Sequence, residues 1–124
     1  MDNLKQILII DDDSKNIFAL NAVLKAKKFD CVSALSANEG FEMVSENKNI
    51  GVVLMDMMMP EMDGYEAIKK MKIDSKMKDI PVISITAQAM SGDREKCLAA
   101  GADGYISKPV DVNELIKLIN QAMK

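Results

Sequence analysis

Residues 7–13 of the sequence are Ile7-Leu8-Ile9-Ile10-Asp11-Asp12-Asp13, four apolar side chains followed directly by three carboxylates. Two similar runs occur later in the chain, Val52-Val53-Leu54-Met55 and Val82-Ile83-Ser84-Ile85, the last interrupted by one serine. Continuous runs of this kind, unlike alternating ones, are typical of strands that helices cover on both faces. The three runs therefore predict the centre of a parallel β-sheet.

Five apolar runs alternate with five segments of helical spacing, which predicts five strand–helix units in succession. The strands are expected at residues 5–11, 31–35, 51–56, 80–86 and 104–107, with the second and fifth, the weakest, at the edges. Right-handed crossovers then predict one α/β domain over residues 1–124, a doubly wound sheet of five parallel strands flanked by five helices. Of the two common strand orders, 2-1-3-4-5 suits a chain of this size.

Local signals mark where the helices begin and end. The first helix is expected over residues 14–27, and the fourth over residues 91–100, ending at Gly101. The other three begin with a capping box, in which a Ser or Asp is followed three residues later by Glu. These pairs are Ser36 with Glu39, Asp63 with Glu66, and Asp111 with Glu114.

The composition excludes several classes of function. The chain has 124 residues, a formal net charge of −3, one arginine and no histidine. Without histidine it has no Ser-His-Asp or Cys-His catalytic set, no His-ligated zinc and no phosphohistidine of its own. The sequence has no basic face that would indicate nucleic-acid binding. It also has no apolar run that suits a membrane span or a secretory signal. Cys31 and Cys97 have no ligand-like spacing, so we expect buried free thiols in a cytoplasmic protein.

Polar side chains follow four of the five expected strands. Asp11 and Asp12 follow the first, Asp56 ends the third, Thr86 ends the fourth and Lys108 follows the fifth. Ligands of doubly wound sheets bind beyond the carboxyl ends of the strands where the strand order reverses, here between the first and third strands. Two carboxylates about 4 Å apart repel by roughly 4 kcal/mol at an effective dielectric of about 20, so the cluster shares protons or holds a cation. Oxygen ligands favour a hard ion, and Mg²⁺ fits better than Ca²⁺, which takes more protein oxygens.

The same edge also carries groups suited to a phosphate. The Thr86 hydroxyl, the Lys108 ammonium group and a divalent cation around one carboxylate would form a cage that stabilises a phosphoryl group. One carboxylate would then be the nucleophile that forms an acyl phosphate, and Asp56 is the candidate because it lies centrally. Simpler interpretations stay open for two residues: Asp13 as the N-cap of the first helix, and Lys108 as part of a structural salt bridge.

These residues resemble the receiver domain of bacterial two-component response regulators, the CheY-like family, over essentially the whole chain. Four motifs carry the resemblance in order and at the family's spacing. They are residues 7–13, Leu54-Met55-Asp56-Met57-Met58-Met59-Pro60-Glu61-Met62-Asp63-Gly64, Ile83-Ser84-Ile85-Thr86-Ala87, and Gly101-Ala102-Asp103-Gly104-Tyr105-Ile106-Ser107-Lys108-Pro109. The resemblance implies the flavodoxin-like strand order 2-1-3-4-5. The run after Asp56 is more similar to receivers of hybrid kinases in phosphorelays than to those of transcriptional regulators.

The resemblance also implies a role for each acidic residue of the site. Asp56 would be the phosphoacceptor. Asp12, Asp56 and the backbone carbonyl of Met58 would bind Mg²⁺ directly, and Asp11 would act mostly through water. In this family such groups promote only the domain's own phosphorylation and dephosphorylation, so we expect a signalling domain and not an enzyme that acts on other substrates.

The remaining motif residues are expected to bind the phosphate and to respond to it. Thr86, the backbone N–H of Ala87 and Lys108 would hold the phosphoryl oxygens, and the Lys108–Pro109 bond would be cis. Tyr105 matches the aromatic switch position, which rotates inward when the hydroxyl residue moves onto the phosphate. The face formed by the fourth helix, the fifth strand and the fifth helix would then repack for a partner.

The expected partner is a sensor histidine kinase or a histidine phosphotransfer protein, because the phosphohistidine must come from outside this chain. A dimer that forms on phosphorylation is possible in this family. Pro60 and Gly64 would shape the loop after Asp56, Gly64 by adopting a positive φ.

Three alternatives were weighed against this interpretation. A haloacid-dehalogenase-type phosphatase also uses an Asp nucleophile with Mg²⁺, but its motif needs Thr or Val where this chain has Lys15. A nucleotide- or flavin-binding module would need a glycine-rich phosphate loop, which is not present. A pseudo-receiver that acts only as a docking scaffold would not need the full set of Asp11, Asp12, Asp56 and the two phosphate-binding side chains. The sequence does not distinguish a stand-alone regulator from a piece of a longer one.

Overall fold

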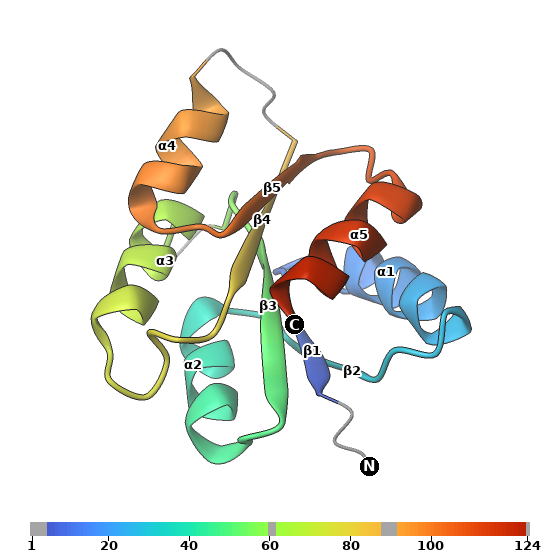
Figure 1. The fold of residues 1–124 in the computed structure, drawn as a ribbon, viewed down its shortest axis with the longest axis horizontal. Coiled ribbons are helices and arrows are strands. Elements are labelled where there is room, and N and C mark those ends of the chain that lie inside the picture. Colours follow the sequence, from blue (N-terminus) through green and yellow to red (C-terminus); the bar gives the residue numbers. More distant parts are fainter. Residues whose placement is uncertain (1–4, 60–61, 88–91, 124) are drawn as a thin grey trace.

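The computed structural model describes residues 5–59, 62–87 and 92–123, which form a parallel sheet with helices on both faces (Figure 1). The five strands lie in the order β2-β1-β3-β4-β5, which confirms the predicted order. Every pair of neighbouring strands is parallel, and the two weakest runs, β2 and β5, occupy the edges. The strands are β1 Gln6–Ile10, β2 Cys31–Ala34, β3 Ile50–Asp56, β4 Val82–Thr86 and β5 Gly104–Ser107.

Helices cover the two faces of the sheet unequally. One face carries α1 and α5, and the other carries α2, α3 and α4 (Figure 1). In β1, Ile7 and Ile9 pack with the first pair of helices, whereas Leu8 and Ile10 pack with the other three. All four side chains are buried, which explains why the central strands are continuously apolar and do not alternate.

The helices begin where the sequence provides caps. Ser36, Asp63 and Asp111 each accept the backbone N–H of the residue three positions later, at 3.1, 2.8 and 3.1 Å, as predicted. The fourth helix ends at Gly101, whose φ of 119° favours glycine, and its expected start at Ser91 lies outside the described residues. The helices are α1 Ser14–Ala26, α2 Ala37–Glu46, α3 Gly64–Ile73, α4 Asp93–Ala100 and α5 Val112–Ala122.

Gly64 has a different role from the predicted one. Among the described residues, positive φ occurs only at Lys28, Gly92 and Gly101, so the expectation of a positive φ at Gly64 was wrong. Gly64 instead begins α3 in close contact with the loop after β3. A Cβ atom at this position would lie 2.7 Å from the Cα atom of Met57, so the reason for glycine is close packing. Pro60, the other residue expected to shape this loop, lies outside the described residues.

The strand register brings the expected site residues to one edge of the sheet. Asp11 follows β1 and Asp56 ends β3, and the register of the two neighbouring strands places these residues side by side. Thr86 ends β4, and its carbonyl accepts the backbone N–H of Lys108 at 2.8 Å, which holds the chain after β5 at the same edge. The fold therefore assembles residues from four segments of the chain at the carboxyl ends of the strands.

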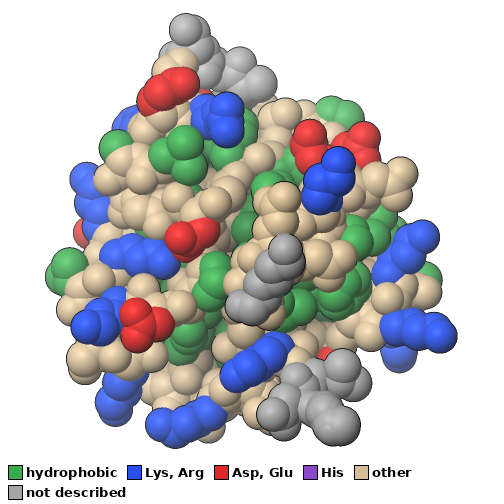
Figure 2. Space-filling model, in the orientation of Figure 1, with side chains coloured by type: hydrophobic (Ala, Val, Ile, Leu, Met, Phe, Trp, Pro, Cys, Tyr) green, Lys and Arg blue, Asp and Glu red, His purple; other side chains and the backbone are tan. Residues whose placement is uncertain are grey.

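Three further observations concern the molecule as a whole. No described helix combines the length and the apolar character that crossing a membrane requires. On the face seen in Figure 2, basic side chains are scattered among the other side chains and do not gather in one patch. Both cysteines are free thiols, with Cys97 buried as expected and Cys31 only partly so.

Candidate functional site

Three carboxylates from two neighbouring strand ends form an acidic cluster. One oxygen each from Asp11, Asp12 and Asp56 lie within 4.8 Å of one another. Asp11 and Asp56 are both 6% exposed, whereas Asp12 is exposed to solvent. The sequence-predicted acidic residues are thus brought together as expected, with the expected nucleophile on the buried side.

The pKa of Asp56 is raised to about 6, from an ordinary value of 3.8. Burial of the carboxyl group is the largest cause, and the nearby charges of Asp11 and, less strongly, Asp12 add to it. Lys108 and a hydrogen bond from the backbone of Met58 act in the opposite direction but do not offset the rise. The cluster therefore has a deficit of positive charge, which a bound cation would supply.

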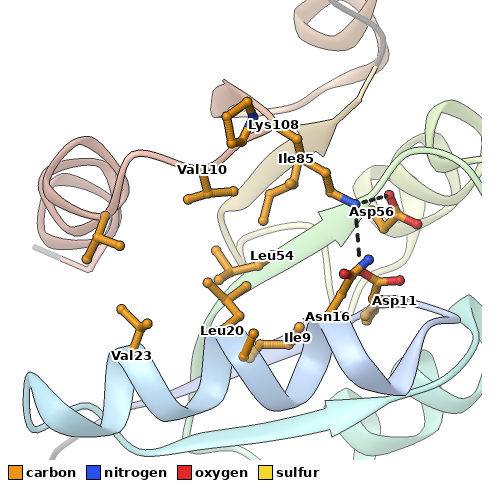
Figure 3. Close-up of a pocket in the computed structure, with 14 residues that line it drawn as sticks. Ile9, Asp11, Asn16, Leu20, Val23, Leu54, Asp56, Ile85, Lys108 and Val110 are labelled. Carbon is orange, nitrogen blue, oxygen red and sulfur yellow. Dashed lines mark ion pairs between the residues drawn. The ribbon is translucent and has the colours of Figure 1, made fainter.

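Lys108 reaches the acidic cluster from the end of β5 (Figure 3). Its Nζ atom lies 3.7 Å from Oδ1 of Asp56 and 4.0 Å from Oδ2 of Asp11. The peptide bond to Pro109 is cis, as predicted. The ammonium group thus forms ion pairs with both buried carboxylates of the cluster.

Asp13 is separate from the cluster and has a structural role. Its side chain accepts the backbone N–H of Lys15 at 2.9 Å and caps α1, so the simpler of its two interpretations is correct. Its own backbone N–H donates to Oδ1 of Asp11 at 2.9 Å. The turn at the start of α1 therefore also orients one of the three site carboxylates.

The other expected residues follow β3 and β4 at the same edge of the sheet. Thr86 is 1% exposed at the end of β4, and the exposed Ala87 follows it. Met58 follows Asp56 by two residues with its side chain 53% exposed, whereas its neighbours Met57 and Met59 are buried. The backbone N–H of Met58 donates a hydrogen bond to Asp56, so the backbone of this loop lies at the acidic cluster.

Tyr105, the expected switch residue, lies partly buried on β5. Its hydroxyl donates to Oδ2 of Asp93 at 3.0 Å, and Tyr65 donates to the other oxygen of the same carboxylate. Tyr65 and Asp93 were not among the residues predicted from the sequence. No local signal could have found them, because an Asp in the first turn of a helix is common and the contact depends on how α3, α4 and β5 pack.

A cavity of about 310 Å³ lies beside the acidic cluster, between α1 and α5 (Figure 3). Asp11, Asp56 and Lys108 lie at one end of it, with Asn16 of α1 close by. Its other walls are mostly apolar, and include Leu20, Val23, Leu54, Ile85 and Val110. This cavity was not predicted from the sequence, because it depends on how far apart α1 and α5 lie.

The residues present suit a magnesium ion. All three side chains of the acidic cluster offer oxygen only, and two of them are buried carboxylates that repel each other. Mg²⁺ is bound by one or two carboxylates, retains several waters and shares its ligands with phosphate oxygens. No sulfur or imidazole ligand, as zinc would prefer, is present among these groups.

Comparisons with known proteins agree with this arrangement. Residues 7–120 match the family model of the response regulator receiver domain. The chain is 33% identical over 115 residues to the polar-differentiation response regulator DivK of Brucella ovis, which covers 93% of each chain. A CheY-like receiver domain protein from Methanospirillum hungatei is 31% identical with a TM-score of 0.84, covering 97% of this chain and 94% of that one.

A further solved structure bears on the acidic cluster. It is the receiver domain of a sensor histidine kinase from Pseudomonas aeruginosa, with a magnesium ion coordinated in its active site cleft. That domain is 27% identical, has a TM-score of 0.85 and covers 96% of this chain and 97% of its own. From its fold, its acidic edge and the match over residues 7–120, this chain belongs to the response regulator receiver domain family.

Proposed function

We propose that Asp56 accepts a phosphoryl group from a phosphohistidine on a sensor histidine kinase or a histidine phosphotransfer protein. The observation that carries this proposal is the placement of Asp56, a buried carboxylate with two more carboxylates beside it and the Lys108 ammonium group 3.7 Å away. These 124 residues contain no histidine, so the phosphohistidine that serves as donor lies outside them.

In the proposed transfer, a carboxylate oxygen of Asp56 attacks the phosphorus atom. A new O–P bond forms while the N–P bond of the phosphohistidine breaks, and its electron pair returns to the imidazole ring. Phosphoryl transfer depends mainly on positioning and on stabilising charge at the phosphoryl oxygens. Lys108, Thr86 and the backbone N–H of Ala87 are the groups of this chain that would contact those oxygens.

Mg²⁺ is the proposed cofactor. Asp12, Asp56 and the backbone carbonyl of Met58 would hold it directly, and Asp11 would act mostly through water. When bound, the ion neutralises negative charge on the carboxylates and the phosphoryl oxygens. The oxygen-only donor set supports this assignment, as does the magnesium ion described for the Pseudomonas aeruginosa receiver.

The phosphate is proposed to act as a signal. Thr86 would move onto the phosphoryl group, Tyr105 would follow, and the face built from α4, β5 and α5 would repack for a partner or for a second copy of the chain. We place this signalling domain over residues 1–124 and in the cytoplasm. The domain would promote only the phosphorylation and dephosphorylation of its own Asp56, and it would turn over no separate substrate.

The experiment is incubation with acetyl phosphate or phosphoramidate, with and without Mg²⁺, followed by mass spectrometry of the intact protein. A gain of one phosphate that needs Mg²⁺ and disappears in Asp56→Asn is expected. Asp13→Asn is the matched control, because Asn also caps a helix well and Asp13 lies outside the acidic cluster. Steady hydrolysis of an unrelated phosphate ester would instead favour a phosphatase, and an unmodified wild-type protein would favour a docking scaffold.

A further inference from the structure

A second buried carboxylate site lies away from the acidic cluster, where α3, α4 and β5 meet. Asp93, the first residue of α4, accepts hydrogen bonds from the hydroxyls of Tyr65 on α3 and Tyr105 on β5. Each tyrosine uses a different oxygen, and the bond from Tyr105 measures 3.0 Å. We call these three residues the two-tyrosine clamp; its three elements lie together on one side of the molecule (Figure 1).

The burial of Asp93 calls for an explanation. Among the described residues only three carboxylates are buried, and the other two, Asp11 and Asp56, belong to the acidic cluster. Asp93 is 7% exposed, and a buried carboxylate is unfavourable unless hydrogen bonds satisfy it. Hydroxyl donors on both oxygens and the first-turn position in α4 supply that compensation.

The groups around the clamp favour the protonated form of both phenols. The hydrogen bond to Asp93 is the largest cause of a raised pKa at Tyr65; burial comes first at Tyr105, followed by its bond to Asp93. The Nζ atom of Lys96 lies 4.3 Å from the centre of the Tyr65 ring, and Cys97 is buried nearby. These are the charged and titratable groups that face the clamp, together with Glu95 of the same helix.

The clamp restrains the residue that is expected to act as the switch. The Tyr105 ring packs against the core on the α2, α3 and α4 side of the sheet, and its hydroxyl ends on Asp93. The N-cap of α4 is Gly92, which provides no side-chain capping hydrogen bond. Asp93 is therefore the side chain that joins the start of α4 to both β5 and α3.

We propose that Asp93 is a positioning residue of the switch, which holds Tyr105 against the α4 side of the sheet and joins it to Tyr65. The role during signalling rests on the proposed function, in which phosphorylation of Asp56 moves Tyr105. Because Tyr105 cannot turn away without giving up its bond to Asp93, the carboxylate sets how readily β5 and α4 respond. Tyr65 remains bonded to the other carboxylate oxygen of Asp93, so α3 stays joined to α4 in both positions of Tyr105.

The test uses ¹³C-ring-labelled tyrosine and NMR, because the chain has two tyrosines and no tryptophan and each signal can be assigned with a Tyr→Phe variant. In unphosphorylated protein, Asp93→Asn is expected to shift both tyrosine signals, because an amide offers only one acceptor oxygen. Glu42→Gln, which removes the same charge from an exposed position of α2, outside the clamp, is expected to shift neither. Tyr65→Phe is a second, milder variant, which is expected to shift the Tyr105 signal because both tyrosines bond to Asp93. When Asp93→Asn is already present, adding Tyr65→Phe is expected to cause no such shift.

The same proteins are then phosphorylated with acetyl phosphate and Mg²⁺. Asp93→Asn is expected to take up phosphate within about twofold of wild type, because Asp93 touches none of the reacting groups. The displacement of its Tyr105 signal on phosphorylation is expected to differ from that in wild type and in Glu42→Gln. Equal displacement in all three, or a Tyr105 signal that Asp93→Asn leaves unshifted before phosphorylation, overturns the inference. A wild-type protein that takes up no phosphate contradicts the proposed function instead, while the unphosphorylated spectra still decide whether Asp93 positions Tyr105.

Discussion

Asp56 shows how one residue can be unfavourable for folding and useful for binding. Its pKa of about 6 instead of 3.8 means that the folded protein resists its ionisation. At roughly 1.4 kcal/mol per unit, a shift of this size corresponds to about 3 kcal/mol in the free energy of ionisation. Burial, followed by the charges of the neighbouring carboxylates, produces this penalty, and a cation among the carboxylates would reduce it.

Asp56→Asn is expected to stabilise the magnesium-free protein at neutral pH. The folded state binds the Asp56 proton more tightly than the unfolded state, so stability falls as pH rises from about 4 to about 6. Asn removes this penalty, and urea unfolding at pH 7 in a chelator should give a gain of about 2 kcal/mol, which shrinks as the pH is lowered to about 4. Asp13→Asn, at the exposed start of α1, should show no such gain. A variant no more stable than wild type at pH 7 would contradict the unfavourable burial of Asp56.

At the scale of elements, the contact between α3 and the loop after β3 positions the backbone of Met58. The N–H of Gly64 donates to the carbonyl of Met57 at 3.2 Å, directly beside Asp56. A side chain at Gly64 would collide with the Met57 backbone and not only with its flexible thioether. The first turn of α3 therefore holds the loop that supplies one of the proposed metal ligands.

Gly64→Ala is expected to destabilise the protein by about 2 kcal/mol, since overpacking against backbone cannot be relieved by a rotamer change. Gly104→Ala is the matched control, because a Cβ atom there would lie 3.3 Å from a side-chain carbon of Ile83 and needs only a small adjustment. Urea unfolding of both variants measures the difference. Equal stability of the two would show that the loop can shift away from α3.

Local sequence signals predicted the helix caps, whereas the role of Gly64 and the contacts of Asp93 depend on packing between distant segments. Caps such as Ser36 and Asp63 act within three residues, so the sequence contains the whole interaction. The role of Gly64 depends on another segment approaching it, and a positive φ was the wrong physical reason. The clamp at Asp93 likewise needs the relative placement of three elements, which no periodicity encodes.

At the scale of the whole molecule, the order of the strands determines where the chemistry can occur. Continuous apolar runs predicted the parallel sheet, and the order 2-1-3-4-5 predicted that Asp11 and Asp56 would meet at one edge. Strand bounds differ from the expected ones by at most two residues. The cavity between α1 and α5 could not be predicted, because it reflects how closely two helices approach.

Binding of Mg²⁺ to this edge is expected to stabilise the entire fold, because the acidic cluster exists only when β1 and β3 are paired. At a concentration about 100 times the dissociation constant, the gain is about 2.7 kcal/mol, seen as a higher midpoint of thermal unfolding. Asp12→Asn should lose most of this rise, whereas Asp13→Asn, one residue further on, should retain it. A rise that persists in Asp12→Asn would place the ion elsewhere.

The central claim is that the carboxylate of Asp56 becomes an acyl phosphate. Reduction with borohydride converts an aspartyl phosphate to homoserine, so the modified residue can be located by peptide mass mapping. After treatment with acetyl phosphate and Mg²⁺, the account predicts homoserine at position 56 and unchanged aspartates at positions 11, 12 and 13. Homoserine at one of those three positions, or a phosphate retained on a hydroxyl such as that of Thr86, would contradict it.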